Sequence, residues 1–138
     1  MRHILTAIGF MIWPVVGRAQ AIDLADAAEQ ARQACMAHDA AALVAQSPRV
    51  QVQLPGAEPS AALGPEQAAA LLNDFFASGQ EVETRVRAAR EVEPGRGYVE
   101  LQRRYRIAGT QDVRVQVLLL SYRKRAGGWS LVEVRVVG

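Results

Sequence analysis

Residues 112–137 read DVRVQVLLLSYRKRAGGWSLVEVRVV, and this stretch decides the fold. On both sides of the Gly127-Gly128 pair, apolar residues alternate with polar ones, a period of two that is typical of β-strands. Two strands joined by so short a turn run antiparallel. The stretch therefore predicts a long β-hairpin, with strands at about residues 112–125 and 129–137.

Two more strands of the same kind precede this hairpin, at about residues 82–92 and 98–108. Turns containing Gly95, Gly97 and Gly109 separate the strands. Strands much longer than the usual five or six residues normally occur in sheets that twist and curve strongly. We therefore expect an antiparallel meander with a concave face.

The first part of the chain has helical periodicity instead. Small apolar residues recur every three or four positions over residues 21–38, and Asp39 is suited to cap a short second helix over residues 40–46. A short strand follows at residues 50–54. A third helix begins at Pro65, ends near Ser78 and carries the most apolar face, so we expect it to cover the sheet.

These elements predict an α+β domain in which N-terminal helices pack on a strongly curved antiparallel sheet. A chain of 138 residues, half of them hydrophobic, can bury one core but not two. We expect residues 20–138 to form this single domain.

Residues 1–19 have the pattern of a secretory signal peptide. Arg2 and His3 precede an uncharged, mostly apolar run of about thirteen residues, which is shorter than the roughly 20 that a membrane-spanning helix needs. Small residues precede two cleavage sites, after Ala19 or after Ala21, and the first fits better than the second. We expect a periplasmic or secreted protein that begins at Gln20 rather than an uncleaved membrane anchor, which its intact mass would show.

The charge balance excludes a general polyanion binder. Without Arg2 and Arg18 the chain has 14 basic and 14 acidic residues, so net charge favours neither nucleic acid nor an anionic membrane surface as a partner. The halves differ, however: residues 20–79 have two basic and seven acidic groups, and residues 80–138 have twelve and seven. Either the two halves neutralise each other, or arginines line a site for an anionic ligand.

The order of elements resembles the cone fold of the nuclear transport factor 2-like superfamily, and in particular small exported bacterial members of unknown function. The resemblance covers nearly the whole chain after residue 20. It implies a cone-shaped pocket and a function among ketosteroid isomerases, dehydratases, cyclases and non-enzymatic binding or assembly domains. The residues that carry it are His38-Asp39, Pro55-Gly56, Gly64-Pro65-Glu66-Gln67-Ala68, Leu72-Asn73-Asp74-Phe75-Phe76 and the ending from Gly128-Trp129 to Val136.

Acid-base catalysis has little support in the sequence. The resemblance places the isomerases' acidic base where this chain has Gln53 and Leu54, and their oxyanion-binding tyrosine near Ala31. His38 is the only histidine after residue 20 and is expected at a surface junction, and the lone Cys35 is expected in the core. We predict no catalytic residue, no metal site and no cofactor.

One strand contains the best candidate for a pocket. Alternation puts Arg103 and Tyr105 on an otherwise apolar face with Val99, Leu101 and Ile107. A charge on such a face needs a partner or a wet cavity. Arg103 is therefore predicted either to pair with a carboxylate from the helices or, as the preferred alternative, to bind an anion in a cavity, with Tyr105 beside it.

The next strand is apolar on both faces in its second half. Val113, Val115, Val117 and Leu119 are expected on one face, and we assign the other, with Leu118, Leu120 and Tyr122, to the outside of the sheet. An exposed apolar row of this kind predicts a homodimer formed sheet against sheet.

Together these features favour an exported, non-catalytic module with a cone-shaped pocket, which binds a small anionic or apolar ligand or takes part in assembly. The alternatives are a small-molecule enzyme of the isomerase, dehydratase or cyclase type and a structural partner protein that uses the apolar outer sheet.

Overall fold

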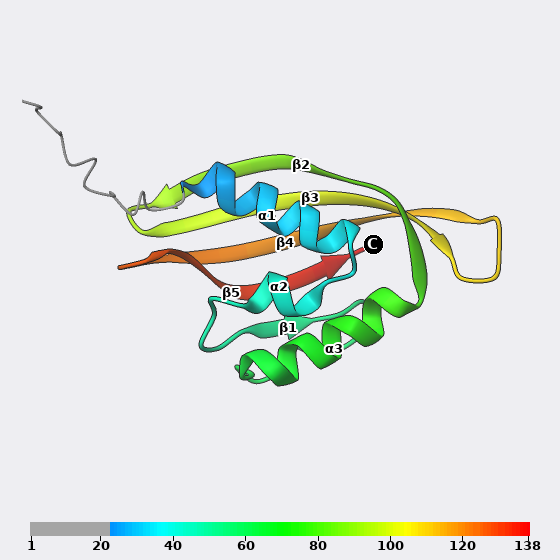
Figure 1. Ribbon diagram of the computed structural model, residues 1–138, viewed down its shortest axis with the longest axis horizontal. Helices are drawn as coiled ribbons and strands as arrows, with labels where there is room; N and C mark the ends of the chain where they lie inside the picture. The colour runs from blue at the N-terminus through cyan, green and yellow to red at the C-terminus, as the bar shows by residue number, and fades with distance from the viewer. Residues whose placement is uncertain (1–22) are drawn as a thin grey trace, which may run out of the picture.

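The computed structural model describes residues 23–138, so the predicted signal peptide lies outside the described residues. Helices and strands follow each other in the order shown in Figure 1. They are α1 Leu24–Met36, α2 Ala40–Val44, β1 Gln51–Gln53, α3 Pro65–Ala77, β2 Gly79–Glu93, β3 Arg96–Ile107, β4 Val113–Arg125 and β5 Gly128–Val137. Among these residues, no helix has the length and apolar character needed to cross a membrane.

The strands form one five-stranded sheet in the order β1-β5-β4-β3-β2. The predicted meander is present, because β2, β3, β4 and β5 pair antiparallel with their neighbours in sequence. The short β1 is parallel to β5, so the expected antiparallel sheet has one parallel edge. The α+β class and the N-terminal position of the helices are as predicted.

Irregularities in the strand pairing bend this sheet. The register between β2 and β3 shifts at three places, and that between β4 and β5 shifts beside Ser121. An extra residue on one strand bends it and increases the local twist, so these bulges give the long strands their curvature. In Figure 1, β2 bends strongly towards its start, where it leaves α3.

Helix α1, rather than α3, lies across the long strands. Its buried face is mostly alanine, which lets the helix axis come close to β2 and β3. Helix α3 lies beside α2, near the β1 edge of the sheet, and contributes Leu72 and Phe76 to the core (Figure 1). The expectation that α3 would cover the sheet is therefore only partly right. As predicted, Asp39 caps α2, accepting a hydrogen bond of 3.0 Å from the Ala42 backbone.

The core fills the space between the helices and one face of the sheet. Leu118 and Leu120 are 0% exposed and Tyr122 is 6% exposed, so the prediction that these three form an exposed dimer interface is wrong. Both faces of β4 are apolar here, and alternation alone cannot tell which face the helices will cover. The outward-facing valines of this sheet are on the other row: Val113, Val115 and Val137 are 41%, 49% and 43% exposed.

The two faces of β4 can be told apart by measurement. Leu118→Ala removes a fully buried side chain and should lower the free energy of unfolding by about 2 to 5 kcal/mol. Leu119→Ala, one residue along on the outer face, should cost clearly less, because Leu119 is only partly buried. Urea denaturation of both variants tests this. Equal costs would contradict the assignment of the two faces.

Candidate functional site

Arg103 lies at the centre of a polar row on the inner face of the sheet. Its neighbours across the strands are Thr84 on β2 and Gln116 on β4. All three side chains belong to buried residues, and Arg103 is 1% exposed. A charge buried so completely must be neutralised by its surroundings.

The neutralising group is Glu81, at the start of β2, whose carboxylate forms an ion pair with the Arg103 guanidinium. Gln116 Oε1 accepts a second hydrogen bond from Arg103 at 3.3 Å. The Tyr105 ring centroid lies 4.4 Å from the guanidinium carbon, and the rings of Phe75 and Phe76 lie at 5.1 and 5.4 Å. The guanidinium is therefore enclosed by one carboxylate, one amide and three aromatic rings.

The Glu81 carboxylate also has hydrogen-bond partners besides Arg103. The Thr84 hydroxyl donates to its Oε2 at 2.9 Å, and His38 Nε2 lies 3.0 Å from its Oε1. His38 adopts a φ of 53° at the junction between α1 and α2, and its ring stacks on Phe76 with centroids 5.2 Å apart. The expected surface junction residue is thus a partly buried member of this cluster. A carboxylate with this many partners is poorly suited to act as a general base.

The structure differs from the preferred expectation for Arg103. The guanidinium is paired with a carboxylate instead of facing a wet cavity, and the carboxylate comes from β2, not from the helices. Tyr105 packs over Arg103 and over Gly79, where an added Cβ would lie 2.6 Å from the Tyr105 ring. Both residues therefore hold the sheet and the start of β2 together.

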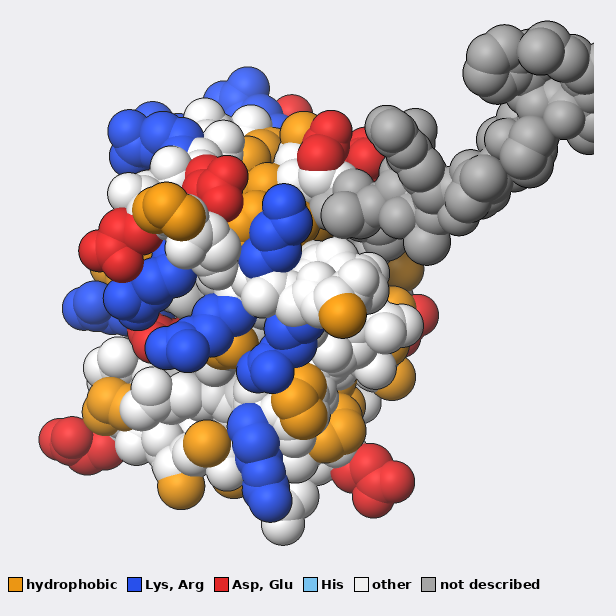
Figure 2. Space-filling model, turned by 90° about the vertical axis from the view of Figure 1, so that its left-hand side faces the viewer, with side chains coloured by type: hydrophobic (Ala, Val, Ile, Leu, Met, Phe, Trp, Pro, Cys, Tyr) orange, Lys and Arg blue, Asp and Glu red, His pale blue; other side chains and the backbone are white. Residues whose placement is uncertain are grey.

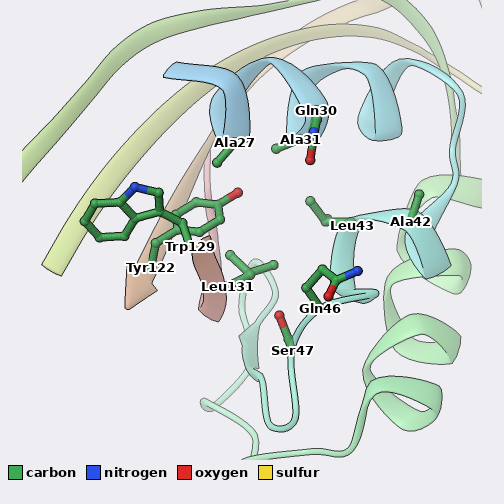
Figure 3. Close-up of a pocket in the computed structure, with 10 residues that line it drawn as sticks. All are labelled: Ala27, Gln30, Ala31, Ala42, Leu43, Gln46, Ser47, Tyr122, Trp129 and Leu131. Carbon is green, nitrogen blue, oxygen red and sulfur yellow. The ribbon is translucent and has the colours of Figure 1, made fainter. Parts of the chain in front are cut away.

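A cleft lies away from Arg103, between α1, α2, the end of β4 and the start of β5. Its inner part encloses about 50 Å³ and its outer part about 540 Å³, and the two share four of their lining residues. Figure 3 shows the inner part, with the Tyr122 hydroxyl pointing into the space between α1 and α2. The residues that line the inner part are Ala27, Gln30, Ala31, Ala42, Leu43, Gln46, Ser47, Tyr122, Trp129 and Leu131.

Four polar side chains of this cleft have no hydrogen-bond partner within residues 23–138. They are the amides of Gln30 and Gln46, which are exposed residues, and the hydroxyls of Ser47 and Tyr122, which are buried residues. Burial raises the pKa of the Tyr122 hydroxyl well above its ordinary value, so this group stays a neutral donor. Apolar walls with a few uncommitted polar groups are typical of small-molecule sites.

Sequence reasoning found part of this cleft for the wrong reason. The sequence pattern assigns Tyr122 to a dimer interface, whereas the structure places it in the wall of the cleft. Nothing in the sequence marks Gln30 on α1, or Gln46 and Ser47 just after α2, because polar residues on a helix or in a connection usually face solvent.

Metal binding and thiol chemistry were the other two possibilities to consider. No three His, Cys, Asp or Glu side chains gather where they could hold a metal ion, within residues 23–138. Cys35 is 0% exposed, and burial raises the pKa of its thiol to about 12, so the thiolate that would react is scarce at neutral pH.

Comparison with known proteins finds similarity in structure only, since no family model and no curated protein sequence matches the chain. A ketosteroid isomerase-like protein from Erwinia carotovora atroseptica superposes with a TM-score of 0.67 at 17% identity, over 84% of this chain and 93% of that one. A protein of the NTF2-like family from Streptomyces avermitilis gives 0.62 at 14% identity, over 84% and 93%. A DUF4783 family protein from Bacteroides ovatus gives 0.64 at 12% identity, over 78% and 90%.

The chain has the nuclear transport factor 2-like fold. This confirms the fold that the order of elements suggested. In this fold, Ala31, which stands near the place of the isomerases' tyrosine, is a buried residue in the wall of the cleft. Gln53 and Leu54 are uncharged and cannot serve as the isomerases' acidic base.

The role of the buried pair can be measured. Arg103→Leu leaves Glu81 buried without its counter-charge and should lower the free energy of unfolding by about 3 to 5 kcal/mol. Adding Glu81→Leu should recover most of this loss, because the stranded charge is then gone. Arg104→Leu, whose side chain is 49% exposed, is the matched control and should change little. A loss below about 1 kcal/mol for Arg103→Leu would contradict a structural role.

Proposed function

We propose that this NTF2-like chain is a non-catalytic ligand-binding domain that holds a small molecule in the cleft between α1, α2 and the ends of β4 and β5. The observation that carries the proposal lies in the inner part of the cleft, where four polar side chains have no hydrogen-bond partner within residues 23–138 and the other lining residues are apolar. Such groups fix the orientation of a ligand whose body fills the apolar space.

The contacts that Glu81 already makes argue against acid-base catalysis. It is the carboxylate nearest the core, and Arg103, Thr84 and His38 already engage it. Among residues 23–138, the walls of the cleft carry no carboxylate and no histidine. Proton transfer would need such a group within hydrogen-bond reach of a ligand.

A small-molecule enzyme of the isomerase, dehydratase or cyclase type is the second candidate. The observation that favours it is the His38 ring, which is 29% exposed and held by Glu81 at 3.0 Å. A histidine oriented by a carboxylate is a common acid-base pair. On this alternative the substrate would approach His38 from outside the cleft.

An exported setting is part of the proposal and rests on the sequence of residues 1–19 alone. Export suits a fold that depends on packing and has a single, deeply buried cysteine, because no disulfide needs to form.

Self-association is proposed through a different surface from the one that the sequence suggested. The outer sheet face carries an apolar patch of Val115, Val117, Leu119 and Val137, in which Val117 and Val137 are partners across β4 and β5. We expect light scattering to show a dimer that dissociates on dilution. Val115→Lys should shift the molecule to the monomer without unfolding it, because Val115 is 49% exposed. A monomer at all concentrations would contradict the dimer.

The cleft can be tested with Tyr122→Phe, which removes only the hydroxyl. The probe is 4-(4-methoxyphenyl)butanamide, whose ether oxygen can accept a hydrogen bond from the Tyr122 hydroxyl in the inner part while its amide lies in the outer part. Its binding is followed by the fluorescence of Trp129 in a full chain carrying Trp13→Phe, where Trp129 is the one remaining tryptophan. Losing one hydrogen bond of about 1 kcal/mol should weaken binding about five-fold. The free energy of unfolding should hardly change, because the hydroxyl has no protein partner in residues 23–138.

Tyr98→Phe is the matched control, since Tyr98 is 46% exposed on the outer sheet face. It should leave binding unchanged. Binding that is equal in both variants, or no binding of the probe at millimolar concentration, would contradict the proposed site.

A further inference from the structure

The outer part of the cleft opens beside the turn between β4 and β5. Arg125, the last residue of β4, lines this part together with Trp129 and Ser130. The Ser130 hydroxyl donates to the backbone carbonyl of Gln46 at 3.1 Å and so ties β5 to the end of α2. This hydrogen bond holds the β4–β5 turn, which carries Arg125, against the wall of the cleft.

The charged side chains at this opening are all basic. Of the described residues that line the two parts of the cleft, Arg125 is the only charged one. Arg123, Lys124 and Arg125 are exposed, and none of them has an ion-pair partner within residues 23–138. By contrast, Arg96 on the neighbouring turn lies 3.6 Å from a Glu93 oxygen.

Figure 2 shows the end of the molecule that carries these turns, with Lys and Arg side chains gathered over it. Lys124 Nζ lies 5.8 Å from the Trp129 ring centroid, above the aromatic wall of the opening. Two cations therefore flank an aromatic surface that leads to the apolar interior. This arrangement raises the local concentration of anions at the opening.

We infer that the ligand of this cleft is a small amphipathic anion, with a planar apolar body along Trp129 and a carboxylate at the opening beside Arg125. The inference rests on the proposed binding function and specifies its ligand class. A guanidinium matches the geometry of a carboxylate, and a charge-assisted hydrogen bond is stronger than a neutral one.

The test compares two probes of nearly equal shape, 4-(4-methoxyphenyl)butanoate and its neutral amide, 4-(4-methoxyphenyl)butanamide, both of which keep the ether oxygen for Tyr122. In the full chain carrying Trp13→Phe, Trp129 fluorescence should show the carboxylate binding about ten-fold more tightly than the amide at low salt, as expected for a charge-assisted contact. Arg125→Gln should abolish this preference and leave the affinity for the amide unchanged. Raising the salt concentration should reduce the preference, because ions screen exposed charges.

Arg114→Gln is the matched control. Arg114 is an exposed arginine at the other end of the same strand, about 35 Å from Arg125 at the usual rise per strand residue. It should leave the preference for the carboxylate intact.

Three results would overturn the inference in different ways. If both probes bind equally and Tyr122→Phe weakens both, the cleft is a binding site for neutral ligands, and only the anion preference is wrong. If neither probe binds, or if binding is indifferent to Tyr122→Phe, the proposed function fails together with the inference. A preference for the carboxylate that Arg114→Gln removes as fully as Arg125→Gln would show unspecific attraction and would also overturn it.

Discussion

The buried ion pair between Arg103 and Glu81 is the constraint on which the arrangement of the core depends. A guanidinium at 1% exposure is tolerable only beside a counter-charge, so the start of β2 must remain where it delivers Glu81 to the inner face. This position in turn fixes the end of α3, because Phe75 and Phe76 close over the guanidinium. It also fixes the junction of α1 and α2, where His38 binds the same carboxylate.

The pair also explains why one end of the cone is closed while the other keeps a cleft. Around Arg103, three aromatic rings and the Glu81 carboxylate, which already has its hydrogen-bond partners, fill the space that a ligand would need. At the opposite end of the inner face, α1 contributes only alanines and Gln30 to the lining, and small side chains cannot fill the gap to Tyr122 and Trp129. The closed end stabilises the fold, and the open end offers uncommitted polar groups.

The position of Glu81 shows where the alternation of residues along a strand fails to predict which face a side chain occupies. A strand without irregularities would put Glu81 and Thr84, three positions apart, on opposite faces. The register shift between Glu81 and Glu83 puts both on the inner face, where they hydrogen-bond to each other. Nothing in the sequence around Val82 marks a bulge, so the partner of Arg103 was sought on the helices.

The order and type of the elements, the long meander, the capping of α2 by Asp39 and the inward position of Arg103 could all be predicted from the sequence. These depend on periodicity and on local hydrogen bonds, which neighbouring residues specify. The folded chain was needed to show which apolar face of β4 the helices cover, what neutralises Arg103 and where the cleft opens. Each of these depends on contacts between residues far apart in the chain, such as Arg103 with Glu81 and Ser130 with Gln46, and on a bulge that changes which side chains share a face.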